Sequence, residues 1–171
     1  MFPKLNLHLF GIRNASIQKT ALFILCVLLP LFVGLLSSSL TSENISMIDQ
    51  LNKPPLFPPR ILFPIVWTIL YILMGIASYL VLVSNGAPND IMDAISAYLL
   101  QLGVNFFWSI FFFNFQAFFF SFLWLVLLWI LIALTIYNFA QVSKTAAYLM
   151  IPYLIWVTFA GYLNLSIFLL N

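Results

Sequence analysis

Residues 94–143 have the sequence AISAYLLQLGVNFFWSIFFFNFQAFFFSFLWLVLLWILIALTIYNFAQVS, and none of these 50 residues carries a charge. As a single α-helix the stretch would be about 75 Å long, at roughly 1.5 Å per residue. That length is more than twice the roughly 30 Å hydrocarbon core of a bilayer. The stretch therefore has to turn back, and Asn114-Phe115-Gln116 is its most polar break. These residues predict two antiparallel membrane-spanning helices, 94–113 and 117–140.

Three further uncharged stretches are each long enough for one spanning helix. They are residues 20–42, 61–89 and 145–171, which comprise 23, 29 and 27 residues. A spanning helix needs roughly 20 apolar residues. The stretches predict helices at 20–40, 60–83 and 145–169. The expected fold class is therefore an all-α integral membrane protein built as a bundle of five transmembrane helices.

The composition agrees with a lipid environment and excludes several classes of protein. Hydrophobic residues make up 64% of the chain and charged residues 6%, with a mean hydropathy of +1.13. A soluble domain would carry roughly 25% charged residues, so the lipid bilayer is the expected partner of most of the surface. The net charge of +2 is too small and too scattered for a nucleic-acid partner. With Cys26 as the single cysteine, an intrachain disulfide or a multi-cysteine metal site is excluded, and no metal is expected.

The Lys and Arg residues are distributed unequally between the two sides of the predicted membrane. Four of the six lie on the N-terminal side and two on the opposite side: Lys4, Arg13, Lys19 and Lys144 against Lys53 and Arg60. The positive-inside rule then predicts a cytoplasmic N-terminus and an external C-terminus. Residues 1–19 are expected to be an N-terminal extension and not a cleaved signal peptide, because the apolar stretch after them is long enough to span.

No ionisable side chain lies at depth within a predicted span, and the only histidine, His8, lies outside the spans. Acid–base or metal catalysis and proton-coupled transport usually need such groups. What remains at depth is aromatic, since Phe, Trp and Tyr make up 18% of the chain. Trp108 and Trp156 fall near the middle of their spans, where lipid tails offer the indole N–H no acceptor. Both are therefore expected to face the interior of the bundle.

Helical spacing places aromatic and small polar side chains on shared faces of three spans. Residues four or three apart lie on one face of a helix, and the sets are Trp67 with Tyr71, Asn105 with Ser109 and Phe112, and Trp156 with Ala160 and Asn164. One interpretation is a site for a flat, mostly apolar ligand held by a few hydrogen bonds. The other is close helix packing, with the amides bonded to neighbouring helices. The spacing alone leaves both open.

The loop between the first two spans, residues 41–59, is unusually rich in proline. Four of the six residues 54–59 are prolines, between Lys53 and Arg60. Proline fixes φ and favours a stiff, extended backbone. Such a segment is typical either of a lid over an opening between helices or of a stiff spacer.

Three blocks of the sequence carry a resemblance to a known family. They are Lys53-Pro54-x-x-x-Pro58-Pro59 followed by Val66-Trp67-Thr68-Ile69-Leu70-Tyr71-x-Leu73-Met74-Gly75-x-Ala77, then Asn105-Phe106-Phe107-Trp108-Ser109-x-Phe111-Phe112-Phe113, and Pro152-Tyr153-Leu154-x-Trp156-x-x-Phe159-Ala160-x-Tyr162-Leu163-Asn164. In order and spacing they resemble the TspO/MBR family, the tryptophan-rich sensory proteins and translocator proteins (peripheral-type benzodiazepine receptors). The resemblance covers residues 20–171, which we predict to form one TspO-like membrane domain.

This resemblance implies a homodimeric five-helix membrane receptor or sensor, with no obligatory cofactor, that binds tetrapyrroles such as porphyrin and haem. It implies a multi-pass protein of the bacterial cell (inner) membrane. The ligand-binding residues it implies are Trp67, Tyr71, Asn105, Ser109, Phe112, Trp156 and Ala160, and those of the lid loop are Pro54, Pro58 and Pro59. Two alternatives remain, a porphyrin photo-oxidising enzyme and a porphyrin or sterol transporter. The sequence departs from the family at Met47-Ile48, where members often carry Trp-Tyr, and at Leu56, which occupies an aromatic position.

Overall fold

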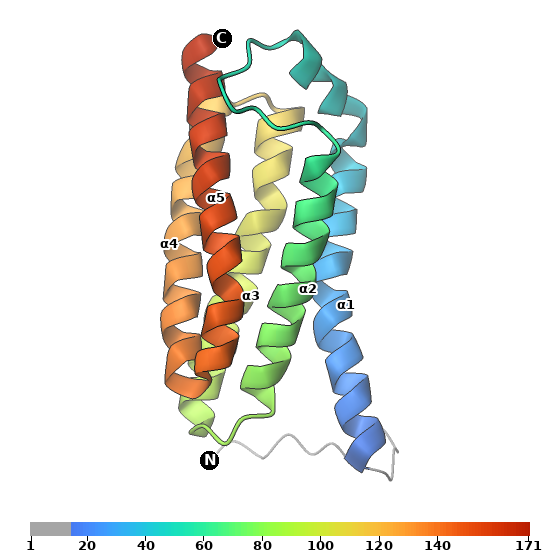
Figure 1. Ribbon diagram of the computed structural model, residues 1–171, viewed down its shortest axis with the longest axis vertical. Coiled ribbons are helices and arrows are strands. Elements are labelled where there is room, and N and C mark those ends of the chain that lie inside the picture. Colours follow the sequence, from blue (N-terminus) through green and yellow to red (C-terminus); the bar gives the residue numbers. More distant parts are fainter. Residues whose placement is uncertain (1–14) are drawn as a thin grey trace.

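The computed structural model describes residues 15–171 and contains five long helices (Figure 1). They are α1 (Ala15–Thr41), α2 (Leu62–Leu82), α3 (Pro88–Ser109), α4 (Phe118–Val142) and α5 (Lys144–Leu170). A 3-10 helix, η2 (Ser42–Gln50), follows α1, and a π-helical turn, η3 (Ile110–Asn114), continues α3. All five helices are long and apolar enough to cross a membrane, and residues 15–171 contain no strand. The predicted all-α fold of five transmembrane helices is confirmed.

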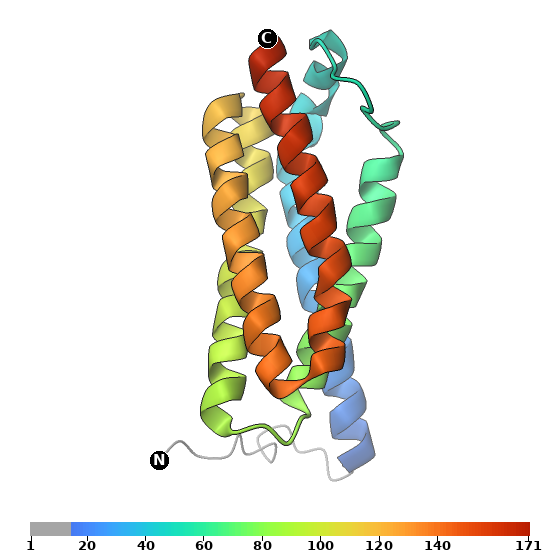
Figure 2. The same ribbon diagram turned by 60° about the vertical axis from the view of Figure 1, so that its left-hand side comes forward.

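The helices form one bundle in which consecutive helices run in opposite directions (Figures 1 and 2). α4 packs against α3 and α5, while α2 packs against α1 and α5. The start of α1 and the connections α2–α3 and α4–α5 lie at one end, which we call the N-terminal end. η2, the loop after it, the α3–α4 turn and the C-terminus lie at the other, which we call the loop end. α3 and α5 therefore run in the same direction, toward the loop end.

The observed helix ends differ from the predicted spans in two places. α3 begins at Pro88, six residues before the predicted start at residue 94. Proline at the start of a helix and Asp90 in its first turn both suit a helix N-terminus, and Asp90 and Asp93 remain exposed. α1 begins at Ala15, so the last five residues of the predicted extension 1–19 belong to this helix. The remainder of that extension lies outside the described residues.

The predicted turn at Asn114-Phe115-Gln116 is confirmed, because η3 ends at Asn114 and α4 begins at Phe118. Gln116 adopts a positive φ of 49°, which reverses the chain within three residues. Pro30 and Pro152 both lie inside helices that continue through them. Neighbouring helices and local adjustments make proline tolerable inside a membrane-spanning helix.

α1 and α2 approach each other closely at two glycines. A Cβ atom on Gly75 would lie 2.5 Å from the Val27 Cα and 2.7 Å from the Cys26 carbonyl oxygen. A Cβ atom on Gly34 would collide with the ring of Tyr71. In lipid there is no hydrophobic driving force between helices, so close van der Waals contact of this kind holds them together. The two glycines thus set the separation of α1 from α2.

The bundle buries its apolar side chains centrally and also presents apolar side chains outward. Met74, Leu128, Ile132 and Met150 are fully buried at the centre. The outward surface carries many exposed large hydrophobic side chains on every long helix, which include Leu25, Phe32, Leu100, Ile130 and Ile155. Such a surface is suited to lipid and not to water.

Adding one methyl group at the α1–α2 contact should destabilise the protein. In Gly75→Ala the new Cβ meets backbone atoms that cannot move aside, so we expect the free energy of unfolding to fall by about 1–3 kcal/mol. Gly161→Ala is the matched control, because nothing lies within 4 Å of its added Cβ. That variant should gain about 0.5–1 kcal/mol from reduced backbone entropy in the unfolded chain. Equal stabilities in detergent unfolding titrations would contradict the close contact.

Candidate ligand-binding site

Three buried polar side chains link α2, α3 and α5 near the middle of the bundle. The Tyr71 hydroxyl donates to Asn105 Oδ1 at 3.0 Å, and Asn105 Nδ2 donates to the Tyr153 hydroxyl at 2.7 Å. All three residues are buried. We call this chain of contacts the Tyr–Asn–Tyr bridge. It uses both ends of one amide to connect three helices in an environment without water.

Aromatic rings extend from the bridge toward the loop end. Trp67 stacks on Tyr71 with ring centroids 5.5 Å apart and lies edge-on to Tyr153 at 6.1 Å. Trp156, three residues after Tyr153 on the same helix, packs edge-on against Phe63 of α2 with centroids 6.0 Å apart. Together with Tyr153, these side chains form an aromatic face between α2 and α5.

Trp156 has an unused hydrogen-bond donor. The indole N–H groups of Trp108, Trp124 and Trp129 all donate to oxygen atoms elsewhere in the bundle. The Nε1 atom of Trp156 is buried and has no partner. A buried donor without an acceptor is destabilising, by roughly 1–3 kcal/mol from mutational data. An acceptor atom on a bound ligand would remove that penalty.

The segment 51–61, which we call the lid loop, is anchored to α5 by hydrogen bonds. The Tyr162 hydroxyl donates to the Pro55 carbonyl at 2.8 Å. The Asn52 backbone N–H donates to Asn171 Oδ1 at 2.9 Å, and Asn171 Nδ2 donates back to the Asn52 carbonyl at 3.2 Å. Phe57 of the loop lies 5.9 Å from the ring of Phe63, so the loop reaches the aromatic face. The predicted lid residues Pro54 and Pro58 are buried, whereas Pro59 is exposed.

The tip of the lid loop contains a strained residue. The Phe57 N–H donates to the Pro54 carbonyl at 3.3 Å and closes a tight turn. Leu56, the third residue of this turn, has a positive φ of 68°, and glycine is the residue usually found at such a position. Its side chain is 79% exposed. Holding a non-glycine residue there costs roughly 1–2 kcal/mol. The aromatic position of the family motif is thus occupied by a leucine that projects outward.

Phe112 and Ser109 do not join the Tyr–Asn–Tyr bridge. Phe112 belongs to a second cluster at the loop end with Ile48 and Ile167. The Ser109 hydroxyl is hydrogen-bonded to the Ser37 hydroxyl of α1, and Ser37 also donates to the Phe106 carbonyl at 3.1 Å. Ser109 therefore connects α3 to α1.

Among the predicted ligand-binding residues, the structure brings Trp67, Tyr71 and Asn105 into one connected group through Tyr153. Trp156 lies on the α5 face that carries Tyr153, and Ala160 is buried one turn further along that helix. Sequence reasoning did not select Tyr153, although its position three residues before Trp156 places it on the same face. It also did not select Phe63, which lies four residues before Trp67.

Asn164 shows the second role that the sequence allowed for intramembrane amides. Its Oδ1 accepts from Trp108 Nε1 at 3.2 Å and from the Ser121 hydroxyl at 3.0 Å. Its Nδ2 donates to the Phe118 carbonyl at 2.9 Å. Both amide atoms are thus bonded to groups of α3 and α4, which is the linking role typical of intramembrane amides.

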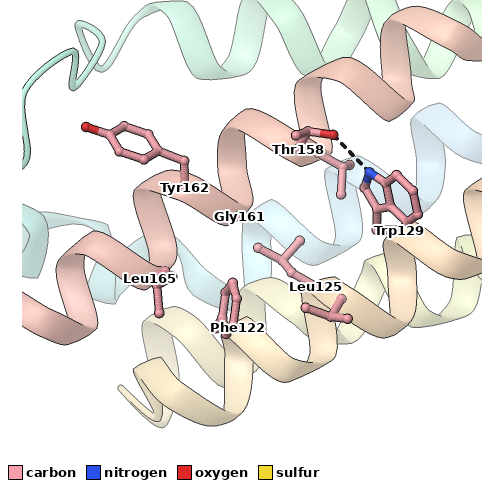
Figure 3. Close-up of a pocket in the computed structure, with 9 residues that line it drawn as sticks. Phe122, Leu125, Trp129, Thr158, Gly161, Tyr162 and Leu165 are labelled. Carbon is pink, nitrogen blue, oxygen red and sulfur yellow. Dashed lines mark hydrogen bonds between the residues drawn. The ribbon is translucent and has the colours of Figure 1, made fainter.

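A separate hollow of about 240 Å³ lies between α4 and α5 (Figure 3). It is lined by Trp129 and Thr158, which are hydrogen-bonded to each other at 2.9 Å, and by Gly161 and Tyr162 among others. None of the predicted ligand-binding residues lines it. Its walls are almost entirely apolar, so it is suited to a lipid tail as much as to any specific ligand.

The profile of the TspO/MBR family matches residues 26–170. The chain belongs to the TspO/MBR family. It is therefore an integral, multi-pass membrane protein, in agreement with its five spanning helices.

Curated relatives support this membership across most of the chain. The tryptophan-rich protein TspO of Chlorobaculum tepidum is 44% identical over 148 residues, which are 86% of this chain and 94% of the relative. The tryptophan-rich sensory protein of Cereibacter sphaeroides is 37% identical over 123 residues, 72% of this chain and 75% of the relative. The translocator protein of Bos taurus is 34% identical over 139 residues, 80% and 82% of the two chains.

Removing the amide of the Tyr–Asn–Tyr bridge should destabilise the bundle. Asn105→Leu leaves two buried tyrosine hydroxyls without partners, at roughly 1–3 kcal/mol each. We expect the free energy of unfolding to fall by about 2–4 kcal/mol in a detergent unfolding titration. Adding Tyr71→Phe and Tyr153→Phe removes both orphaned hydroxyls, so the triple variant should recover part of that loss. A triple variant less stable than Asn105→Leu would contradict the bridge.

Proposed function

We propose that the protein is a membrane receptor or sensor that binds tetrapyrroles, such as porphyrin and haem, and similar flat apolar ligands. The proposed site is the aromatic face between α2 and α5, beneath the lid loop. The observation that carries the proposal is the row of rings that runs from Tyr71 to Phe57 and contains the unused N–H of Trp156. Family membership supports the general role without the ligand, that of a membrane protein related to the tryptophan-rich sensory proteins and translocator proteins.

The chemistry of the site matches that of a tetrapyrrole. Aromatic rings stack on or contact the edge of a flat π-system, and the Trp156 N–H offers one directed hydrogen bond. Porphyrin carboxylates would lie near the membrane surface, where the lid loop carries two cations. Lys53 and Arg60 share the single carboxylate of Asp49, at 3.5 and 2.6 Å. Within this group of three side chains one positive charge is in excess.

The packing also indicates how a ligand would enter. Phe63 contacts both Phe57 and Trp156, so a ligand that enters between these rings has to displace at least one of them. The lid loop is held mainly by hydrogen bonds to Tyr162 and Asn171 at the exposed end of α5. Lid opening is therefore the step that we expect to admit the ligand. Every charged side chain among residues 17–171 is exposed, which favours binding over acid–base catalysis within the bundle.

A porphyrin titration tests the proposed site. Trp156→Ala removes one ring and the unused donor, so we expect the dissociation constant for protoporphyrin to rise at least about tenfold, equivalent to about 1.4 kcal/mol. Binding is followed in the absorption band of the porphyrin, which does not depend on the number of tryptophans.

Trp129→Phe is the control for this titration, because Trp129 lies on the outer face of α4 and α5. It should leave the affinity for protoporphyrin unchanged. Equal affinities of the wild type and Trp156→Ala would contradict the site. A loss of affinity in Trp129→Phe alone would indicate that the porphyrin binds in the hollow between α4 and α5.

The proposed orientation, with the N-terminal end in the cytoplasm, predicts which engineered cysteines react from outside the cell. In a Cys26→Ala background, Glu43→Cys at the loop end should react with a membrane-impermeant maleimide on intact cells. Asn85→Cys, in the α2–α3 connection, should react only after the cells are opened. Both positions are exposed in the protein. The reverse labelling pattern would contradict the orientation.

A further inference from the structure

One polar face of α3 continues below the Tyr–Asn–Tyr bridge, toward the N-terminal end. Tyr98, Gln101 and Asn105 are spaced by three and four residues, so they lie on one side of the helix. All three are buried. Both amide atoms of Asn105 have partners in the bridge, whereas the side-chain polar atoms of Gln101 and Tyr98 have none.

Gln101 is a buried amide without hydrogen bonds. Its exposed fraction is 0%, and neither Oε1 nor Nε2 has a partner. Exchanging the oxygen and nitrogen positions of the amide would not help, because both atoms lack partners. The hydroxyl of Tyr98, one turn away and 2% exposed, also lacks a partner. Three buried polar atoms within one turn of helix thus have no hydrogen-bond partner.

The protein side chains at this level offer little to bond with. Met150 is three residues before Tyr153, and Met74 is three residues after Tyr71. α2 runs away from the loop end and α5 runs toward it (Figure 1). Met74 and Met150 therefore lie one turn beyond Tyr71 and Tyr153, on the same side of the bridge as Gln101. Both are fully buried and apolar. The Ser78 hydroxyl faces Tyr98 and donates to the Gly75 carbonyl of its own helix at 3.0 Å, so toward Tyr98 it can act only as an acceptor and it offers nothing to Gln101 Oε1.

A buried amide without hydrogen-bond partners is strongly destabilising, because nothing replaces the hydrogen bonds that it makes with water in the unfolded chain. Hydrocarbon cannot relieve this penalty, and Gln101 is closed to lipid in any case. The partner has to be small, because the residue is enclosed. It has to be neutral, since every charged side chain among residues 17–171 is exposed. It must also both donate and accept, because the amide presents an acceptor and a donor.

We propose that Gln101 and Tyr98 form an internal water-binding site in the core of the bundle. A buried water typically makes about three hydrogen bonds to polar groups that are otherwise unsatisfied. Gln101 Oε1, Gln101 Nε2 and the Tyr98 hydroxyl are three unsatisfied polar atoms of this kind, carried by neighbouring turns of α3. The site is distinct from the proposed tetrapyrrole site, because it lies on the opposite side of Asn105 from the lid loop.

X-ray radiolysis of the ligand-free protein in lipid nanodiscs tests this proposal. Hydroxyl radicals formed from a bound water oxidise the side chains beside it, and mass spectrometry locates the modification. We expect oxidation of Tyr98 in the wild type despite its burial. In Gln101→Met, which replaces the amide by an apolar side chain of similar length, the label on Tyr98 should fall to the unirradiated background.

Thr135→Val is the matched control variant. Thr135 is equally buried, but its hydroxyl is already bonded to the Leu131 carbonyl at 2.8 Å. Tyr98 should be oxidised in this variant as in the wild type. Exposed Tyr148 reports equal radical dose in all samples. Absence of label on Tyr98 in the wild type, or equal label in wild type and Gln101→Met, would overturn the proposal.

A second measurement needs no variant. In water-edited solid-state NMR, magnetisation passes from water to nearby protein atoms, and the side-chain amide nitrogen of Gln101 should receive it. The Asn164 amide is the internal reference, since it is buried and bonded entirely to protein. Transfer to Gln101 no faster than to Asn164 would contradict a bound water, even if Gln101→Met fails to fold.

Discussion

The bundle depends on one constraint, that polar groups in hydrocarbon find their partners inside the protein. The Tyr–Asn–Tyr bridge is the clearest case, since Asn105 joins α2, α3 and α5 with a single amide. Asn164 makes the corresponding connection between α3, α4 and α5. Ser37 and Ser109 connect α1 to α3. These directed contacts fix the rotation of each helix about its own axis. Close packing of apolar side chains alone specifies that rotation poorly.

The aromatic face follows from that fixed rotation. With Tyr71 and Tyr153 both bonded to Asn105, the next turns of α2 and α5 bring Trp67 against Tyr153 and Phe63 against Trp156. The lid loop closes the face because Phe57 packs on Phe63, while the end of α5 holds the loop by hydrogen bonds. The structural bridge and the proposed ligand site are therefore parts of the same arrangement. Of the two interpretations that helical spacing left open, hydrogen bonding between helices describes Asn105 and Asn164, and the ligand site remains our proposal for the neighbouring rings.

Charge spacing was enough to predict the five helices, because lipid excludes charges from spanning segments. It placed the start of α3 too late, since Asp90 and Asp93 lie in the exposed first turns of that helix. Spacing also grouped Asn105, Ser109 and Phe112 on one face. The π-helical turn at Ile110–Asn114 changes the periodicity after Ser109, so Phe112 enters a different cluster. The contact of Ser109 with α1 depends on which helices become neighbours in the bundle, and local sequence spacing does not predict that.

The most direct test of the central claim is a structure of the protein with protoporphyrin bound in a lipid environment. The account predicts the macrocycle between α2 and α5, beneath the lid loop, with Trp67 or Trp156 against its face and a ligand acceptor near Trp156 Nε1. The Tyr–Asn–Tyr bridge should remain intact below it. A porphyrin seated instead in the outer hollow between α4 and α5 would contradict the account (Figure 3).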